Sequence, residues 1–144
     1  MKLERIVVGV DGSDNSLAAV RWAANLAAGM GAEVVAVHAL GLLDKVGPGG
    51  AVPAQPHRED IRRHFEEEWC APLDAPGIAS RRMVRDGNPV SVLLAVADEE
   101  DADLIVVGSR GLGGYPELLL GSTSTQVAQR ARCPVAVFPS AAAS

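Results

Sequence analysis

Aromatic residues are scarce in this chain, and it has no excess of positive charge. Aromatics make up 3% of its 144 residues, and 13 Lys and Arg stand against 18 Asp and Glu, for a net charge of −5. Binding to a nucleic-acid backbone needs a concentrated positive field, and no aromatic residues lie in a basic context where bases could stack. The composition therefore argues against a nucleic-acid partner.

Cysteines and long apolar runs are also scarce. The two cysteines, Cys70 and Cys133, lie far apart without CxxC spacing, which argues against a disulfide framework or a zinc site and favours free thiols. No apolar stretch approaches the roughly 20 residues of a membrane span, and no charged-then-apolar leader opens the sequence. We therefore expect a cytoplasmic protein without a membrane partner.

What the chain has in abundance is aliphatic residues, and 48% of its residues are hydrophobic. The length predicts one domain over residues 1–144. Short Val-rich runs alternate with longer Ala- and Leu-rich runs, which predicts an α/β fold with a parallel sheet and right-handed crossovers. Strands are expected at 5–10, 33–40, 78–84, 104–107 and 134–138. Helices are expected from the 11–16 turn to Met30, around 61–69, from 87 or 88 to the acidic run 98–101, and over 118–131.

The loops after these strands hold the informative residues. In a doubly wound parallel sheet the ligand binds beyond the carboxyl ends of the strands, where the strand order reverses. Asp11, Ala39 and the turn at Gly108 each follow a strand, so we expect them to meet at one edge of the sheet. The Gly- and Pro-rich segment 41–56 predicts a long mobile loop.

A glycine pattern follows the fourth of these strands. Gly108 and Gly111 are three residues apart, and Gly121–Ser122 comes nine residues after Gly111 at the start of a helical pattern. Glycines let backbone amides approach an anion closely, and a helix start adds free N–H groups and a positive dipole end. The glycines could simply form a turn and cap a helix, but their position between a strand and a helix favours a phosphate site.

Two other phosphate motifs are absent. A Walker A loop needs Gly-Lys followed by Ser or Thr, and the sequence has no Gly-Lys pair. The first turn, residues 9–12, lacks the glycine spacing of a dinucleotide fingerprint. The chain is therefore neither a P-loop ATPase nor an ordinary nicotinamide dehydrogenase.

Residues 8–13 (Val-Gly-Val-Asp-Gly-Ser), residues 37–39 (Val-His-Ala) and the Gly-x-x-Gly-x9-Gly-Ser pattern closely resemble the universal stress protein family, in its ATP-binding branch. The resemblance runs from Ile6 to Phe138, and residues 41–76 are its least typical part. It implies a five-stranded parallel sheet in a Rossmann-like, doubly wound arrangement of the adenine nucleotide alpha hydrolase-like type, with an ATP site at the switch point.

The resemblance also assigns roles to individual residues. Asp11 would lie near the ribose and phosphates, with Gly9 and Val10 beside the base or sugar, and Ala39 would offer backbone groups to adenine. Val107, Gly108 and Gly111 would line the ribose–phosphate turn, and Gly121, Ser122 and Thr123 would hold the phosphates. Arg110 could reach a phosphate but could equally project into solvent. Pro116 departs from the pattern, because it lacks an N–H within the nine-residue spacer.

The residues also allow interpretations of Asp11, His38 and Trp69 that do not depend on the resemblance. Asp11 could accept ribose hydroxyls or help to hold a Mg²⁺ ion bridged by ATP phosphates, or it could only cap the first helix. His38 is expected to have a core or tuning role, since no nucleophile or carboxylate pattern completes a triad. Trp69 is expected to be core. The sequence therefore predicts no catalytic residue and no dedicated metal site.

The function that follows is an ATP-binding regulatory protein of the stress-response type. One alternative is a slow ATP hydrolase or phosphotransferase, although only Arg110 offers a cation near the motif. Another is a dimeric interaction module with a vestigial nucleotide site. The apolar run 134–139 is an outer strand in the family topology, so the resemblance and the open edge together predict a homodimer through it.

Overall fold

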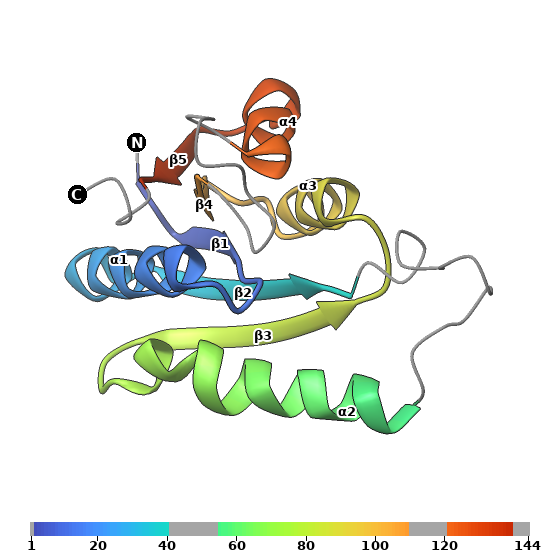
Figure 1. The fold of residues 1–144 in the computed structure, drawn as a ribbon. Helices are drawn as coiled ribbons and strands as arrows, with labels where there is room; N and C mark the ends of the chain where they lie inside the picture. The colour runs from blue at the N-terminus through green and yellow to red at the C-terminus, as the bar shows by residue number, and fades with distance from the viewer. Residues whose placement is uncertain (1, 41–54, 110–120, 140–144) are drawn as a thin grey trace.

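The computed structural model describes residues 2–40, 55–109 and 121–139, and side chains are described from residue 58 in the second of these ranges (Figure 1). Its strands form one sheet in the order β3-β2-β1-β4-β5, with all neighbours parallel. The strands are β1 (Arg5–Gly9), β2 (Glu33–Ala39), β3 (Ala79–Arg85), β4 (Leu104–Gly108) and β5 (Val135–Phe138). The predicted five-stranded, doubly wound parallel sheet is confirmed.

Helices alternate with the strands along the chain, as the periodicity predicted. They are α1 (Asp14–Met30), α2 (Gln55–His64), α3 (Pro89–Glu99) and α4 (Ser122–Arg130). Between α2 and β3 lie a π-helical turn, Phe65–Trp69, and a 3₁₀ turn, Ala71–Asp74. The expected helix at 61–69 is thus formed in two parts: the end of α2 up to His64, and the π-helical turn that begins at Phe65. Residues 41–54 and 110–120, which include most of the expected loop at 41–56 and Pro116, lie outside the described residues.

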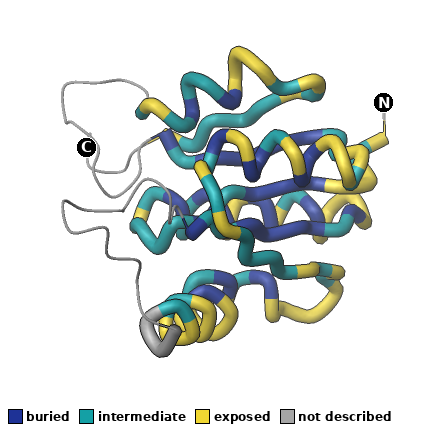
Figure 2. Tube along the Cα trace, turned by 90° about the vertical axis from the view of Figure 1, so that its right-hand side faces the viewer, coloured by how far each residue is buried: buried dark blue, intermediate teal, exposed yellow. Residues whose placement is uncertain are grey.

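Two cores lie on opposite faces of the sheet. One includes α1 and the fully buried Phe65, and the other includes α3 and Val127 of α4. Figure 1 shows α3 and α4 next to each other on their face. The strand residues alternate between these two cores, since Val7 and Val8 of β1 belong to different clusters. Figure 2 shows the buried residues gathered along the strands in the middle of the molecule, as expected for a parallel sheet covered on both faces.

The helix ends follow local signals. Ser13 caps α1 by accepting a hydrogen bond from the Ser16 amide, and Gly31 ends the helix in the left-handed conformation (φ 68°). Asn88 caps α3 by accepting from the amides of Val90 and Ser91. Such caps satisfy backbone donors that a helix start leaves unpaired. They fix where each helix begins relative to the strand before it.

The two edge strands differ in how they are protected. β3 carries arginines that pair with the acidic end of α3: Arg85 bonds Glu99, and Arg81 bonds both Glu100 and Glu33. The Arg81 guanidinium lowers the pKa of the Glu100 carboxyl, so these pairs offset the acidic run at the negative pole of the helix. In β5 all four residues are half-buried.

Of the helices that the structure describes, none has the length and apolarity to cross a membrane.

Candidate functional site

The candidate site is the rim where β1 and β4, neighbours at the switch point of the sheet, both end. Their register pairs Val8 with Val106, so the segments that leave the two strands start side by side. We use "the rim" for residues 10–13 after β1, residues 108–109 after β4, and residues 121–124 at the start of α4. This is the edge at which open α/β sheets bind ligands.

Asp11 shapes the first turn of the rim. Its Oδ1 atom accepts hydrogen bonds from the Ser13 amide (2.9 Å) and the Ser13 hydroxyl (2.6 Å), while its own amide donates to the Ser16 hydroxyl (3.3 Å). Ser13, not Asp11, caps α1. The capping interpretation of Asp11 is therefore wrong. Among the described residues, none donates a hydrogen bond to Asp11 Oδ2.

The β4 side of the rim is held to α1 by Asn15. A Cβ atom at Gly108 would lie 2.8 Å from Asn15 Oδ1, so only glycine lets the two segments approach this closely. The Ser109 hydroxyl donates to Asn15 Oδ1 (3.3 Å), and Asn15 Nδ2 donates to the Pro139 carbonyl (3.0 Å). In the sequence Asn15 is one residue of a polar turn, and nothing local indicates a partner in distant β5.

The start of α4 forms the third side of the rim. The Gly121 amide donates to the Ser109 carbonyl, and the buried Ser124 hydroxyl donates to the carbonyls of Ser109 and Gly121, each at 3.1 Å. Among the described residues, no side chain caps this helix or accepts from the first-turn amides of Ser122 and Thr123. Such amides and the positive helix pole suit an anion. Of the three hydroxyls here, that of Ser124 is occupied internally.

The remaining predicted residues fall into three groups. Gly9 and Ala39 end β1 and β2 at the same edge of the sheet. The side chains of Val10 and Val107 are buried in the two cores, so only their backbone groups could meet a ligand. Arg110 and Gly111 lie outside the described residues.

The rim has no preformed metal centre. Within residues 2–40, 55–109 and 121–139, no three His, Cys, Asp or Glu side chains gather to hold a metal ion. Asp11 supplies one carboxylate, which fits an ion that takes its other ligands from phosphates and water. A dedicated protein site for Mg²⁺ is therefore not formed by these residues, whereas a phosphate-bridged ion fits them.

Neither cysteine suits nucleophilic chemistry. Burial raises the pKa of the Cys70 thiol to about 12, despite the nearby Arg82 guanidinium, which lowers it. Burial likewise raises the pKa of the Cys133 thiol. Both groups are therefore protonated at neutral pH, and a thiol without thiolate character is a poor nucleophile.

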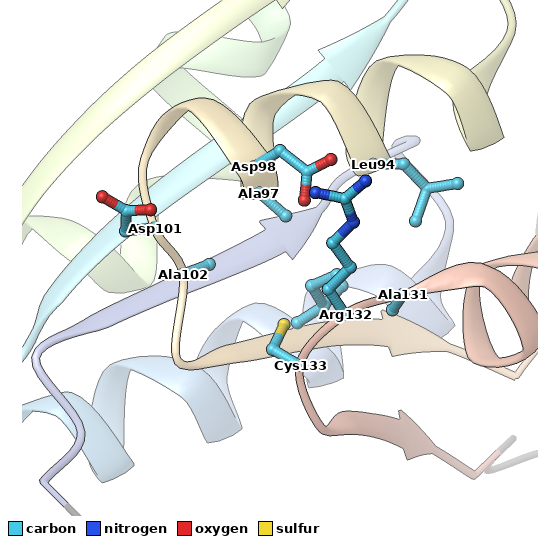
Figure 3. A pocket seen from close by; sticks show the side chains of 9 residues that line it. Leu94, Ala97, Asp98, Asp101, Ala102, Ala131, Arg132 and Cys133 are labelled. Atoms are coloured by element: carbon cyan, nitrogen blue, oxygen red, sulfur yellow. The ribbon is translucent and has the colours of Figure 1, made fainter.

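A separate hollow of about 270 Å³ lies at the other end of the sheet, beside the end of α3 and the start of β5 (Figure 3). Asp98, Arg132 and Cys133 line it together with the apolar Leu94 and Ile105. These residues are next to the amino ends of β4 and β5. The hollow is thus distinct from the rim.

Comparisons with known proteins agree with this fold. The family model of the universal stress protein family matches residues 2–139. Universal stress protein MJ0531 of Methanocaldococcus jannaschii is 33% identical over 93% of this chain and 81% of its own length. A universal stress protein solved in complex with cAMP is 35% identical, with a TM-score of 0.65 and coverage of 96% of this chain and 98% of that one. The universal stress protein of Archaeoglobus fulgidus in complex with dAMP is 26% identical, with a TM-score of 0.72 and coverage of 96% and 99%. The chain belongs to the universal stress protein family.

Proposed function

We propose that this protein binds an adenine nucleotide at the rim, with ATP as the principal ligand, and acts as a regulatory universal stress protein. One observation carries the proposal: β1 and β4 are neighbours in the sheet, Asp11 follows β1, and the first turn of α4, which no described side chain caps, is bonded through Gly121 to Ser109 after β4. The solved relatives with cAMP and dAMP support it, because each of those ligands joins an adenine to a phosphate.

Different residues of this edge of the sheet would contact different parts of the nucleotide. The amides of Ser122 and Thr123, at the positive pole of α4, would donate to phosphate oxygens. Asp11 Oδ2 would accept from a ribose hydroxyl or bind a Mg²⁺ ion held by the phosphates. Ala39, at the carboxyl end of β2, would offer backbone groups to adenine. Every one of these contacts uses an atom at the carboxyl edge of the sheet.

Calorimetry with ATP, ADP, AMP and cAMP tests the proposal, with GTP as the control for the base. We expect saturable heat with the adenine nucleotides and weaker binding of GTP. If no adenine nucleotide gave heat or a thermal shift with the purified protein, the proposal would be wrong. Extraction of the purified protein and chromatography of the released small molecules would show whether a nucleotide is carried along.

A matched pair of variants tests the site itself. Asp11→Asn keeps the Oδ1 acceptor that shapes the turn but removes the charge, and should lower the affinity for Mg-ATP about tenfold, as expected for a charged hydrogen bond. Asp14→Asn makes the same change three residues away, on an exposed side chain in the first turn of α1. We expect Asp14→Asn to bind ATP as the wild type does. Equal affinities of the two variants would exclude Asp11 from the site.

We expect at most slow ATP hydrolysis. Phosphoryl transfer needs positive charge around the transferred group, and the rim as defined here contains no lysine or arginine. Phosphate release by the wild type should therefore not exceed that of Asp11→Asn. Steady release well above this control would favour the alternative, a slow ATP hydrolase or phosphotransferase.

We also propose a homodimer through the C-terminal strand, residues 134–139. The carbonyls of Pro134 and Phe138 accept hydrogen bonds from β4, so the backbone groups of Val135 and Val137 face the open edge of the sheet. Edge groups that pair with no other described strand, beside half-buried apolar side chains, favour pairing with another strand. Light scattering should give twice the chain mass of 14.9 kDa. Val137→Pro removes one outward N–H and should give a monomer, whereas a monomeric wild type would contradict the proposal.

A further inference from the structure

Two ring side chains contact the backbone of the Asp11 turn: His38 at the Val10 carbonyl and Trp69 at Gly12. His38 of β2 and Trp69 of the π-helical turn form a T-shaped pair, with ring centroids 5.2 Å apart and planes at 70°. Phe65 lies on the same side of His38, at 5.9 Å between centroids. Both His38 and Trp69 are half-buried, whereas Phe65 is fully buried. The pair is therefore anchored in the core on one side and reaches the rim on the other.

His38 fixes the peptide that leads into Asp11. Its Nδ1 atom is 2.7 Å from the Val10 carbonyl, and because a carbonyl oxygen only accepts, Nδ1 carries the hydrogen. The Val10 amide donates to the Val37 carbonyl at 2.9 Å. The Val10 carbonyl and the Asp11 amide belong to one planar peptide unit. A bond to that carbonyl therefore sets the direction of the Asp11 amide as well.

Trp69 fixes the next residue. Gly12 has φ +85°, and a Cβ atom built there would lie 2.6 Å from Trp69 Cζ2 and 2.8 Å from Cε2. The indole thus packs directly on the Gly12 backbone, in the space that any side chain would need. Gly12 has the left-handed conformation that glycine adopts without cost. The ring contact then favours this conformation over the others that a glycine could adopt.

We propose that His38 and Trp69 are positioning residues for the nucleotide site, holding residues 10–12 so that Asp11 faces the ligand. The inference rests on the proposed nucleotide-binding function and deepens it. The π-helical turn is part of the arrangement, because Trp69 reaches Gly12 from its last position. Neither ring needs to touch the nucleotide for this role.

The chain offers a clean optical test, since it has two tryptophans and the other, Trp22, is 39% exposed on α1. In Trp22→Phe, Trp69 is the only tryptophan, and its emission should change saturably with ATP at the affinity that calorimetry gives. In Trp69→Phe, the remaining Trp22 should stay silent during the same titration. Unchanged Trp69 emission, while calorimetry shows ATP binding, would overturn the inference and leave the proposed function standing.

Affinity measurements test His38 separately. His38→Leu removes the donor to Val10 and should weaken ATP binding about tenfold, the factor that corresponds to loss of roughly one hydrogen bond. His38→Asn keeps an amide donor on the same side chain and should restore most of that loss. Titrations are run well below each variant's unfolding midpoint, so a purely structural role would lower Tm but leave the affinity unchanged. An unchanged affinity in His38→Leu, together with no loss of affinity in Trp69→Ala, would overturn the inference.

The two proposals fail differently. If the wild type binds no adenine nucleotide, the proposed function is wrong and the positioning role falls with it. If the wild type binds ATP and the His38 and Trp69 variants bind equally well, only the positioning role is wrong. Amide hydrogen exchange at residues 11–13, faster in His38→Leu than in the wild type without ligand, would support the role even where His38→Leu is too unstable for calorimetry.

Discussion

Ser124 provides a sharp test of how the rim is held together. Its side chain is 2% exposed, and its hydroxyl donates to the carbonyls of Ser109 and Gly121, each at 3.1 Å. Ser124→Ala removes these bonds, whose net contribution to the free energy of unfolding is about 1 kcal/mol. Alanine is also a better helix former than serine by about 0.5 kcal/mol, which hides part of the loss. A single variant would therefore underestimate the contribution of the buried hydroxyl.

Ser122→Ala separates the two effects. Ser122 lies two residues earlier in the same helix, is exposed, and accepts a hydrogen bond from Gln126 Nε2 at 3.0 Å on the surface. Both variants share most of the propensity gain, so the difference in unfolding free energy between them reports the buried bonds. Urea denaturation should place Ser124→Ala about 1 kcal/mol below Ser122→Ala, and its Tm about 4 °C lower. Equal stabilities would refute the view that Ser124 fixes α4 to the end of β4.

Three further predictions concern charge and titration. Burial raises the pKa of the Cys70 thiol to about 12 in the folded protein, so above about pH 9 this thiol ionises in the unfolded chain before it does in the folded one. The free energy of unfolding should therefore fall by about 1.4 kcal/mol per pH unit in that range. Cys70→Ala should remove this pH dependence in urea denaturation. A thiol reagent at about pH 8 should modify at most Cys133 in the native protein, and both cysteines in denaturant. Arg81→Gln should raise the pKa of Glu100, as followed by NMR, and its small loss of stability should shrink as salt is added, because exposed ion pairs are screened.

The sequence predicted the sheet well because its strands are buried on both faces. Runs such as residues 6–8 and 34–37 are continuous and mostly β-branched, and only strands of a covered parallel sheet combine that composition with that length. The arrangement after residue 64 could not be predicted in the same way. A spacing of four between Phe65 and Trp69 fits an α-helix and a π-helical turn alike, and the choice depends on packing against His38 and Gly12, which are distant in the sequence.

The candidate site could be predicted from the sequence where chain order alone places its residues. Asp11 and Gly108 follow two strands that the topology makes neighbours, and the sequence predicted both for that reason. The residues it missed are the ones whose partners come from elsewhere in the fold. Asn15 was counted only as a turn residue, yet its amide reaches β5. Trp69 was expected to be core and does pack against it, but it also packs on the turn that carries Asp11, which the sequence did not indicate.

Asn15 also connects the two proposals about function. The Phe138 carbonyl accepts from the Ser109 amide (2.8 Å) and from Asn15 Nδ2 (3.3 Å), so the last residue of β5 is bonded both to the rim at Ser109 and to the first turn of α1. A dimer formed through β5 would restrain that carbonyl, and a nucleotide at the rim would restrain its partners. If nucleotide binding strengthens dimerisation by some free energy, dimerisation must strengthen nucleotide binding by the same amount. Nucleotide binding and dimerisation are therefore expected to be coupled through Asn15 and Ser109, with no contact needed between the ligand and the partner chain.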